Sequence, residues 1–190
     1  YCDTGQWEAA DAAYARLQAA PPREVFWQAD VEKYHAETLI YRGLDAAAAL
    51  DKAERLALQS NDALIYRQVR GWRGEVALRD GDTEAAIAYF EERIQLSRKA
   101  GAGDVGVPLG GLARAYAHRG EHDRALEIVA ELDEDDINAA EVYHLTGDGD
   151  KACAYALRAY KAAWADGPPY VWWWALQRAQ AVLDALGEAY

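Results

Sequence analysis

Apolar residues recur at helical spacing along almost the whole chain. Leu109, Leu112, Ala113 and Tyr116 form one such stripe, and residues 125–129 contain another. Steps of three and four residues place side chains on one face of an α-helix. No stretch has the strict alternation of a half-buried β-strand. The pattern therefore predicts an all-α protein.

Start and stop signals divide the chain into ten predicted helices. Pro21-Pro22 and Pro168-Pro169 stand where proline opens a helix without removing an interior hydrogen bond. The predicted helices span residues 6–19, 23–41, 45–59, 62–79, 83–100, 105–119, 122–130, 135–145, 149–165 and 169–186.

A glycine followed five residues later by an alanine divides the chain into repeats. The glycines are Gly5, Gly43, Gly81, Gly120 and Gly147, at successive spacings of 38, 38, 39 and 27 residues. Glycine ends a helix in a backbone conformation that is costly for other residues, and a following acidic residue suits the positive end of the next helix. The sequence thus predicts about five antiparallel helix pairs that bury their sides by stacking.

Two motifs resemble the tetratricopeptide repeat family. Leu112-Ala113-x-x-Tyr116 is similar to the Leu-Gly-x-x-Tyr stretch of its first helix, and Ala86-x-x-x-Phe90 matches the Ala-x-x-x-Phe stretch of its second. The resemblance implies one repeat domain over residues 1–190, a right-handed superhelical solenoid, and a capping helix at 168–190. It also implies binding of a protein or peptide, without catalysis or a cofactor.

The repeats are longer than the usual period of about 34 residues. Such long repeats, and the segment 164–170 with the helix that follows it, are similar to the sensor regions of bacterial signalling ATPases of the STAND class. This resemblance implies a sensor domain. Because the sequence has neither a spanning apolar run nor an export signal, we expect the protein to be cytoplasmic. Because the chain starts at Tyr1 and contains no methionine, we expect it to be a fragment of a larger protein.

Composition narrows the classes of partner. The 190 residues include 20 basic and 32 acidic side chains, for a formal charge of −12. This charge disfavours nucleic acid and anionic membrane as partners.

No apolar run approaches the roughly 20 residues of a spanning helix, and no export signal opens the chain. Cys2 and Cys153 lie far apart and are expected to be ordinary thiols.

Three patterns could carry chemistry, but their surroundings argue against it. Gly101-x-Gly103-x-x-Gly106 has the form of a phosphate-binding loop, yet it follows a predicted helix instead of a strand. The acidic run 133–136 lacks the glycine and glutamate of a calcium loop, and we expect one of its last two aspartates to cap a helix. His118 and His122 are separated by a hinge, and no glutamate directly follows the first histidine as in the zinc-protease pattern.

Trp172, Trp173 and Trp174 are consecutive in the last predicted helix. Three adjacent positions span most of a helix circumference, so the three rings cannot all enter one core. We expect them to cover the end of the solenoid. An exposed aromatic contact site is the alternative.

The family resemblance also implies a binding face. Ligand contacts in that family come from the first helix of each pair, on the concave side, at fixed distances before the junction glycine. Carried over to this chain, the polar and aromatic positions are Lys33, Glu37, Tyr41, Gln68, Glu75, Arg79, Arg114, His118, Glu141 and His144. The same rule also gives Asp30, Ile40, Gly71, Leu78, Val107, Gly110 and Ala117.

These observations predict a monomeric, non-catalytic recognition module that binds a protein or peptide on its concave face. Two alternatives stay open. The charged positions could be no more than solvated helix faces. The chain could also be a structural module that self-associates through its aromatic last helix.

Overall fold

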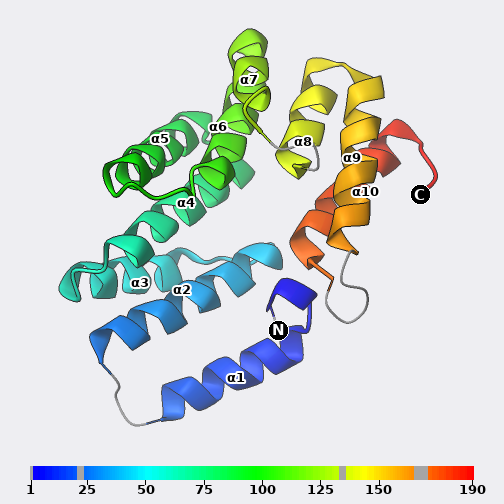
Figure 1. Cartoon of the computed structure of the whole chain (residues 1–190). Helices are drawn as coiled ribbons and strands as arrows, with labels where there is room; N and C mark the ends of the chain where they lie inside the picture. Colours follow the sequence, from blue (N-terminus) through cyan, green and yellow to red (C-terminus); the bar gives the residue numbers. More distant parts are fainter. Residues whose placement is uncertain (1, 21–23, 133–135, 165–170) are drawn as a thin grey trace.

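The computed structural model describes residues 2–20, 24–132, 136–164 and 171–190. These residues form a short 3-10 helix and ten α-helices, and the described ranges contain no strand (Figure 1). The elements are η1 (Cys2–Thr4), α1 (Trp7–Ala19), α2 (Val25–Tyr41), α3 (Ala47–Gln59), α4 (Ala63–Arg79), α5 (Thr83–Lys99), α6 (Gly106–His118), α7 (His122–Val129), α8 (Ile137–Thr146), α9 (Gly149–Ala163) and α10 (Trp173–Leu186). The all-α prediction is confirmed, with every helix end within four residues of its predicted position.

Glycine hinges make four helix hairpins. Gly43, Gly81, Gly120 and Gly147 join α2 to α3, α4 to α5, α6 to α7 and α8 to α9, with φ between +68° and +86°. At each hinge the next residue donates its N–H to a carbonyl five residues back, as from Glu121 to Tyr116 at 2.9 Å. This cap needs a left-handed residue, which explains the glycines. The helices α1 and α10 flank the four hairpins.

A single aromatic ring holds three helices together. Phe90 of α5 is 1% exposed and lies between Gly74 of α4 and Gly111 of α6. A Cβ atom added at Gly74 or Gly111 would lie 2.7 or 2.5 Å from this ring. The ring therefore fits only because both facing residues lack a side chain. The Ala-x-x-x-Phe motif thus marks the contact that stacks one hairpin on the next.

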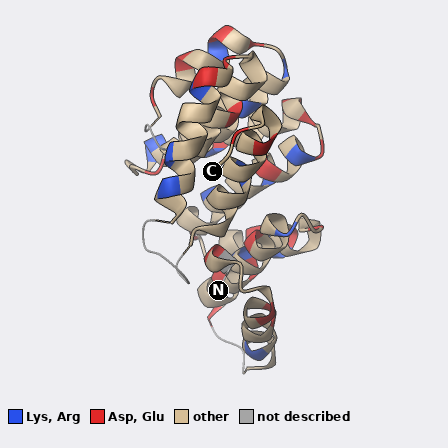
Figure 2. Ribbon diagram, turned by 90° about the vertical axis from the view of Figure 1, so that its right-hand side faces the viewer, with Lys and Arg blue, Asp and Glu red and all other residues tan. Residues whose placement is uncertain are grey.

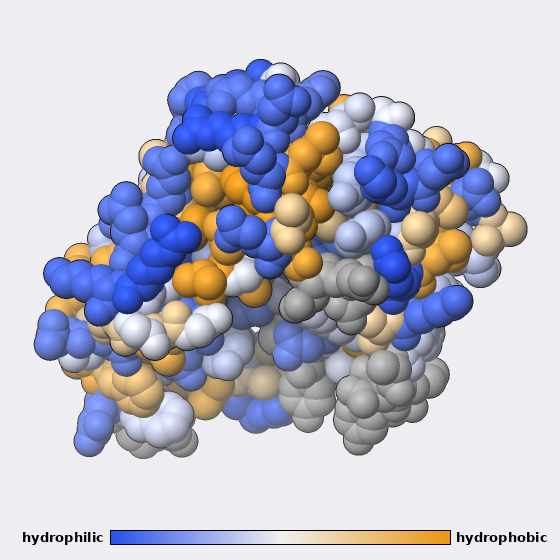
Figure 3. All heavy atoms as spheres, turned by 45° about the horizontal axis from the view of Figure 1, so that its top comes forward, coloured by the Kyte–Doolittle hydropathy of each residue, from blue (hydrophilic) through white to orange (hydrophobic). Residues whose placement is uncertain are grey.

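The hairpins stack in chain order, as predicted. The first helices of successive hairpins contact one another, from α2 to α4, α6, α8 and finally α10. Figure 1 shows the helices following one another around an arc, and we call the row of first helices, α2, α4, α6, α8 and α10, the inner layer. Hydrophilic residues cover much of the upper edge of the face that Figure 3 shows, and a group of hydrophobic residues lies below them in the middle of that face. The architecture is a helical repeat solenoid.

The two ends of the arc touch. The Trp173 ring lies 6.3 Å from the Trp7 ring and packs over Gly5, and α10 contacts η1. Trp174 stacks on Tyr41 at the end of α2, with 5.3 Å between ring centroids. Trp172 is 51% exposed. Two of the three adjacent tryptophans thus cover the N-terminal end of the same chain, and the third faces solvent.

Candidate functional site

Five polar side chains from four first helices meet on the inner layer. Arg114 of α6 donates to Glu75 of α4 at 2.8 Å and to Asn138 of α8 at 2.9 Å, and its Nε lies 3.1 Å from Glu141. Arg178 of α10 donates to Glu141 at 2.6 Å and to Asn138 at 2.7 Å. We call these five residues the inner charge network. It links α4, α6, α8 and α10, and its four formal charges cancel.

The inner charge network is largely shielded from water. The side chain of Arg114 is 8% exposed, that of Glu75 11% and that of Glu141 23%. Burial by itself would raise the pKa of the Glu141 carboxyl, but the Arg178 and Arg114 guanidinium groups outweigh it and hold this pKa below its usual range. Glu141 is therefore ionised at neutral pH.

The local sequence positions Asn138 within the network. Asp136 caps α8 by accepting the backbone N–H of Asn138 at 2.7 Å, and the same oxygen accepts the Asn138 amide group at 2.7 Å. Asn138 lies directly over Gly110 of α6, where a Cβ atom would clash with the amide. The predicted acidic cap is confirmed at Asp136, while residues 133–135 lie outside the described residues.

An aromatic cluster adjoins the network. Tyr41 of α2, Trp72 of α4 and Trp174 of α10 have ring centroids 5.3 to 5.6 Å apart. The guanidinium of Arg178 lies 4.5 Å from the Trp174 ring centroid, so a cation–π contact joins the cluster to the network. Both tryptophans are half-buried. Parts of their rings are therefore available for contact with a partner.

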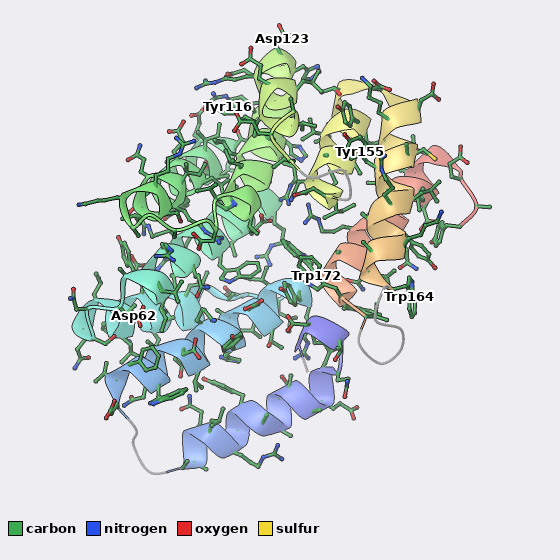
Figure 4. The ribbon with its side chains drawn as sticks, in the orientation of Figure 1. Asp62, Tyr116, Asp123, Tyr155, Trp164 and Trp172 are labelled. Atoms are coloured by element: carbon green, nitrogen blue, oxygen red, sulfur yellow. The ribbon has the colours of Figure 1, made fainter. Side chains whose placement is uncertain are left out.

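A cavity opens where α2 approaches the start of α10. It has a volume of about 370 Å³ and is lined by Asp3, Glu37, Tyr41, Val171 and Trp172, together with Thr4. Figure 4 shows Trp172 at the start of α10. Burial raises the pKa of the Glu37 carboxyl, and the Tyr41 hydroxyl donates to it at 2.7 Å.

The residues carried over from the family divide by exposure. Three of them are exposed at the ends of α4, α6 and α8: Arg79, His118 and His144. Four are half-buried: Glu37, Gln68, Glu75 and Glu141. The remaining three are buried: Lys33, Tyr41 and Arg114.

The structure brings part of this set together. Glu75, Arg114 and Glu141 meet in the inner charge network, and His118 lies close enough to feel the charges of Arg114 and Glu141. Burial, with Arg114 as a second cause, lowers the pKa of His118. Lys33 lies apart, paired with Asp30 of its own helix at 3.2 Å. Arg79 donates to the Leu44 carbonyl near the hinge between α2 and α3.

Sequence reasoning missed Trp72, Asn138 and Arg178, and it named Trp174 only as one of the three adjacent tryptophans. Gly187 ends α10 with a φ of +73°, as the hinge glycines end the other first helices. The position nine residues before a helix-ending glycine is Trp72 for Gly81, Asn138 for Gly147 and Arg178 for Gly187. Trp174 lies thirteen residues before Gly187. Treating Gly187 as a hinge would therefore have found α10 as part of the face.

The remaining candidate patterns form ordinary connections. Gly101 ends α5 with a φ of +64°, and Gly106 begins α6 without a preceding strand. His118 and His122 lie on different helices, on either side of Gly120. Within the described ranges, no cluster of three or more histidine, cysteine or acidic side chains could hold a metal ion. Cys153 is a free thiol, and burial raises its pKa.

Acidic and basic residues are interspersed on the side of the molecule that Figure 2 presents. Among the helices of the described ranges, none has both the length and the apolar character needed to span a bilayer. A comparison with curated proteins and one with solved structures gave no match.

A family model described as "Tetratricopeptide repeat" matches residues 77–149, from the end of α4 to the start of α9. Such repeats are typically non-catalytic and mediate protein–protein interaction. The matched segment contains Phe90, Gly111 and Arg114, which carry the stacking contact and the centre of the inner charge network. The match assigns residues 77–149 to the tetratricopeptide repeat family, and the same stacking of helix hairpins continues on both sides of this segment.

Proposed function

We propose that this chain is a recognition module that binds a protein or peptide segment along its inner layer. The observation that carries the proposal is the meeting of Glu75, Arg114, Glu141 and Arg178, from four successive first helices, beside a half-buried aromatic cluster. Rigid charged groups and aromatic faces together provide directional hydrogen bonds and contact area. A bound segment would need little rearrangement of this face.

The carried-over residues take different parts in the proposed binding. Arg79, His118 and His144 are exposed and would contact the partner directly, with Gln68 and Glu37 beside them. Glu75 and Glu141 would offer carboxylate oxygens at the edge of the network. Lys33, Tyr41 and Arg114 are buried, so they would act by holding these groups in place.

The setting that we propose is the sensor region of a bacterial signalling protein of the STAND class, in the cytoplasm. Hinge spacings of 38, 38 and 39 residues support this proposal, because they exceed the usual period of about 34. The event to be sensed would be the binding of the partner. Domains outside the 190 residues would convert it into a signal.

Site-specific photocrosslinking tests the inner layer as the binding face. A photoreactive phenylalanine analogue is placed at His118, beside the inner charge network, or at His122, which is exposed on the second helix of the same hairpin. We expect a partner protein to crosslink to the analogue at position 118 and not to the analogue at position 122. The double variant Arg79→Ala/His144→Ala should weaken the crosslink at position 118. Equal crosslinking at both positions would refute the proposal.

Self-association through the last helix is the second candidate function. Trp172 supports it, because this large ring is 51% exposed at the start of α10. Trp173 and Trp174 are engaged within the chain, which leaves a smaller aromatic surface than the three rings together. Light scattering over a range of concentrations decides this point: dimers that Trp172→Ser abolishes would support self-association.

A further inference from the structure

Arg93 is a buried arginine that lacks a hydrogen-bond partner. It lies on α5, one turn beyond Phe90, and is only 9% exposed. Its Nε atom is buried without a partner, and the described ranges contain no hydrogen bond or ion pair of its two terminal nitrogens. An arginine keeps its positive charge in a protein. Because a shielded charge without a partner is costly, its presence here calls for an explanation.

The side chain of Arg93 fills a gap in the inner layer. It lies against Gly71 of α4, where an added Cβ atom would clash with Nη1 and lie 2.7 Å from Cδ. Gly71 is one of the positions that the family resemblance places on the binding face, and Gln68 and Glu75 lie one turn to either side of it. An arginine from the second helix of the hairpin thus reaches the row of first helices.

The other glycine of the predicted face shows a contrast. Gly71 and Gly110 both lie ten residues before a hinge glycine. Asn138 lies over Gly110, and its amide group donates to Asp136 at 2.7 Å and accepts from Arg114 at 2.9 Å. The arginine that lies over Gly71 has no such partner. The fold therefore satisfies the polar group at one glycine and leaves the charged group at the other glycine without a partner.

The two carboxylates that act most strongly on Arg93 pair with other arginines. Asp104 accepts from Arg67 at 3.3 Å, and Glu75 accepts from Arg114 at 2.8 Å. Burial lowers the pKa of the Arg93 guanidinium, and the charges of Asp104 and Glu75 oppose this effect only in part. A negatively charged group from another molecule would therefore meet an uncompensated positive charge in a shielded setting, where such a pair is stronger than in water.

We propose that Arg93 is the anion-binding residue of the inner layer and pairs with an acidic side chain of the bound segment. A guanidinium group can hold both oxygens of a carboxylate. The four charges of the inner charge network cancel, so Arg93 supplies a positive charge that this network lacks. Since α4 lies between α2 and α6, a segment that runs along the inner layer passes Arg93 with its side chains. The inference rests on the proposed function for the source of the carboxylate.

NMR spectroscopy of the arginine Nε–H groups tests the proposal on the intact 190-residue chain. The probe is N-acetyl-glutamate methylamide, and the matched control is its glutamine analogue, both added at constant ionic strength. We expect only the glutamate probe to shift the Arg93 Nε–H signal and the Gly71 amide signal, with saturation. The Nε–H signals of Arg114 and Arg178, which already face Glu141, are internal controls and should not move.

Two arginine variants test whether the charge serves binding or folding. Arg93→Met should abolish the glutamate-dependent shift at Gly71 and should leave the unfolding temperature unchanged or raise it by roughly 2–4 °C, because a shielded charge without a partner is removed. The control Arg73→Met removes an α4 arginine that pairs with Asp51 and Glu54, and the shift at Gly71 should persist. Unfolding of Arg93→Met at a clearly lower temperature would show that the arginine stabilises the fold and would overturn the proposal.

The outcomes of this test differ from those of the photocrosslinking at position 118. A saturable shift without a crosslink would support the carboxylate site although partner binding fails. A crosslink without a glutamate-dependent shift would overturn the site and leave partner binding standing. Equal shifts with the glutamate and glutamine probes would also overturn it. Stronger binding of N-acetylglycine or of inorganic phosphate would do the same, since it would assign the site to a chain terminus or to a phosphate group.

Discussion

Arg114 is the side chain on which the inner charge network depends most. It is 7% exposed and pairs with Glu75, Asn138 and Glu141. Arg114→Ala leaves the shielded Glu75 carboxylate without its arginine partner, while Glu141 keeps Arg178, so we expect a loss of about 3–5 kcal/mol in the free energy of unfolding. Urea denaturation measures it. Arg124→Ala removes an exposed arginine that pairs with Glu121 at 3.3 Å, and this control should cost less than about 1 kcal/mol.

Glu141 makes the network sensitive to acid. Its pKa is held below the usual range in the folded state, so its contribution to stability is present above the pKa of the unfolded chain and is lost as the pH falls through the folded pKa. The free energy of unfolding should therefore fall with acidification below the usual carboxyl range. Glu141→Gln should be less stable at neutral pH but should have a shallower acid slope. Identical slopes in the two proteins would contradict this assignment.

At the scale of the element, the Phe90 contact decides whether hairpins stack. Gly111→Ala places a Cβ atom against the Phe90 ring, and we expect it to cost about 1–3 kcal/mol despite the better helix propensity of alanine. In a Phe90→Leu background the same change should cost clearly less, because the ring is gone. Gly106→Ala, where a Cβ atom meets nothing within 4 Å, is the control and should be neutral or stabilising. Thermal unfolding of the unchanged chain, the two single variants and the double variant measures the coupling, and Gly106→Ala is unfolded beside them.

The sequence predicted helices and hinges well because their signals are local. Glycine at a left-handed position and an acidic cap are visible within six residues, as at Gly81 and Asp82, which accepts the Ala85 N–H at 3.0 Å. The hinge between α3 and α4 escaped the glycine search because Asn61 takes the left-handed conformation there, with a φ of 55°. Short polar side chains tolerate that conformation, so a search for glycine alone is incomplete.

The candidate site was predictable only in part, because its members belong to different repeats. Glu75, Arg114 and Glu141 each lie six residues before a hinge glycine, and helix periodicity places this position on the same face of each first helix, where the three side chains meet. Periodicity does not reveal that these charges pair with one another and become shielded. That outcome depends on the distance between neighbouring first helices, which Gly110 and Asn138 set through their close packing.

At the scale of the whole molecule, closure of the arc was the least predictable feature. Tyr41 and Trp174 are far apart in sequence, and their contact depends on the small rotation between successive repeats, added over the whole solenoid. The same closure brings α10, the last helix of the arc, next to η1 and α2, and so places the aromatic cluster beside the inner charge network. A bound segment would thus contact both ends of the arc at once.

Closure also predicts a measurable change in shape. Trp174→Ala removes the stacking on Tyr41 and the contact with Trp72, so the ends of the arc should separate and the radius of gyration from X-ray scattering should rise. Trp164→Ala, which removes a ring in edge contact with Tyr160 at 6.5 Å, is the control and should leave the radius unchanged. Because opening exposes the inner layer, hydrogen exchange of the α2 and α10 amides should also become faster in Trp174→Ala. An unchanged radius with unchanged exchange would mean that η1 and Trp173 suffice to hold the ends together, and that the aromatic cluster serves the inner face without closing the arc.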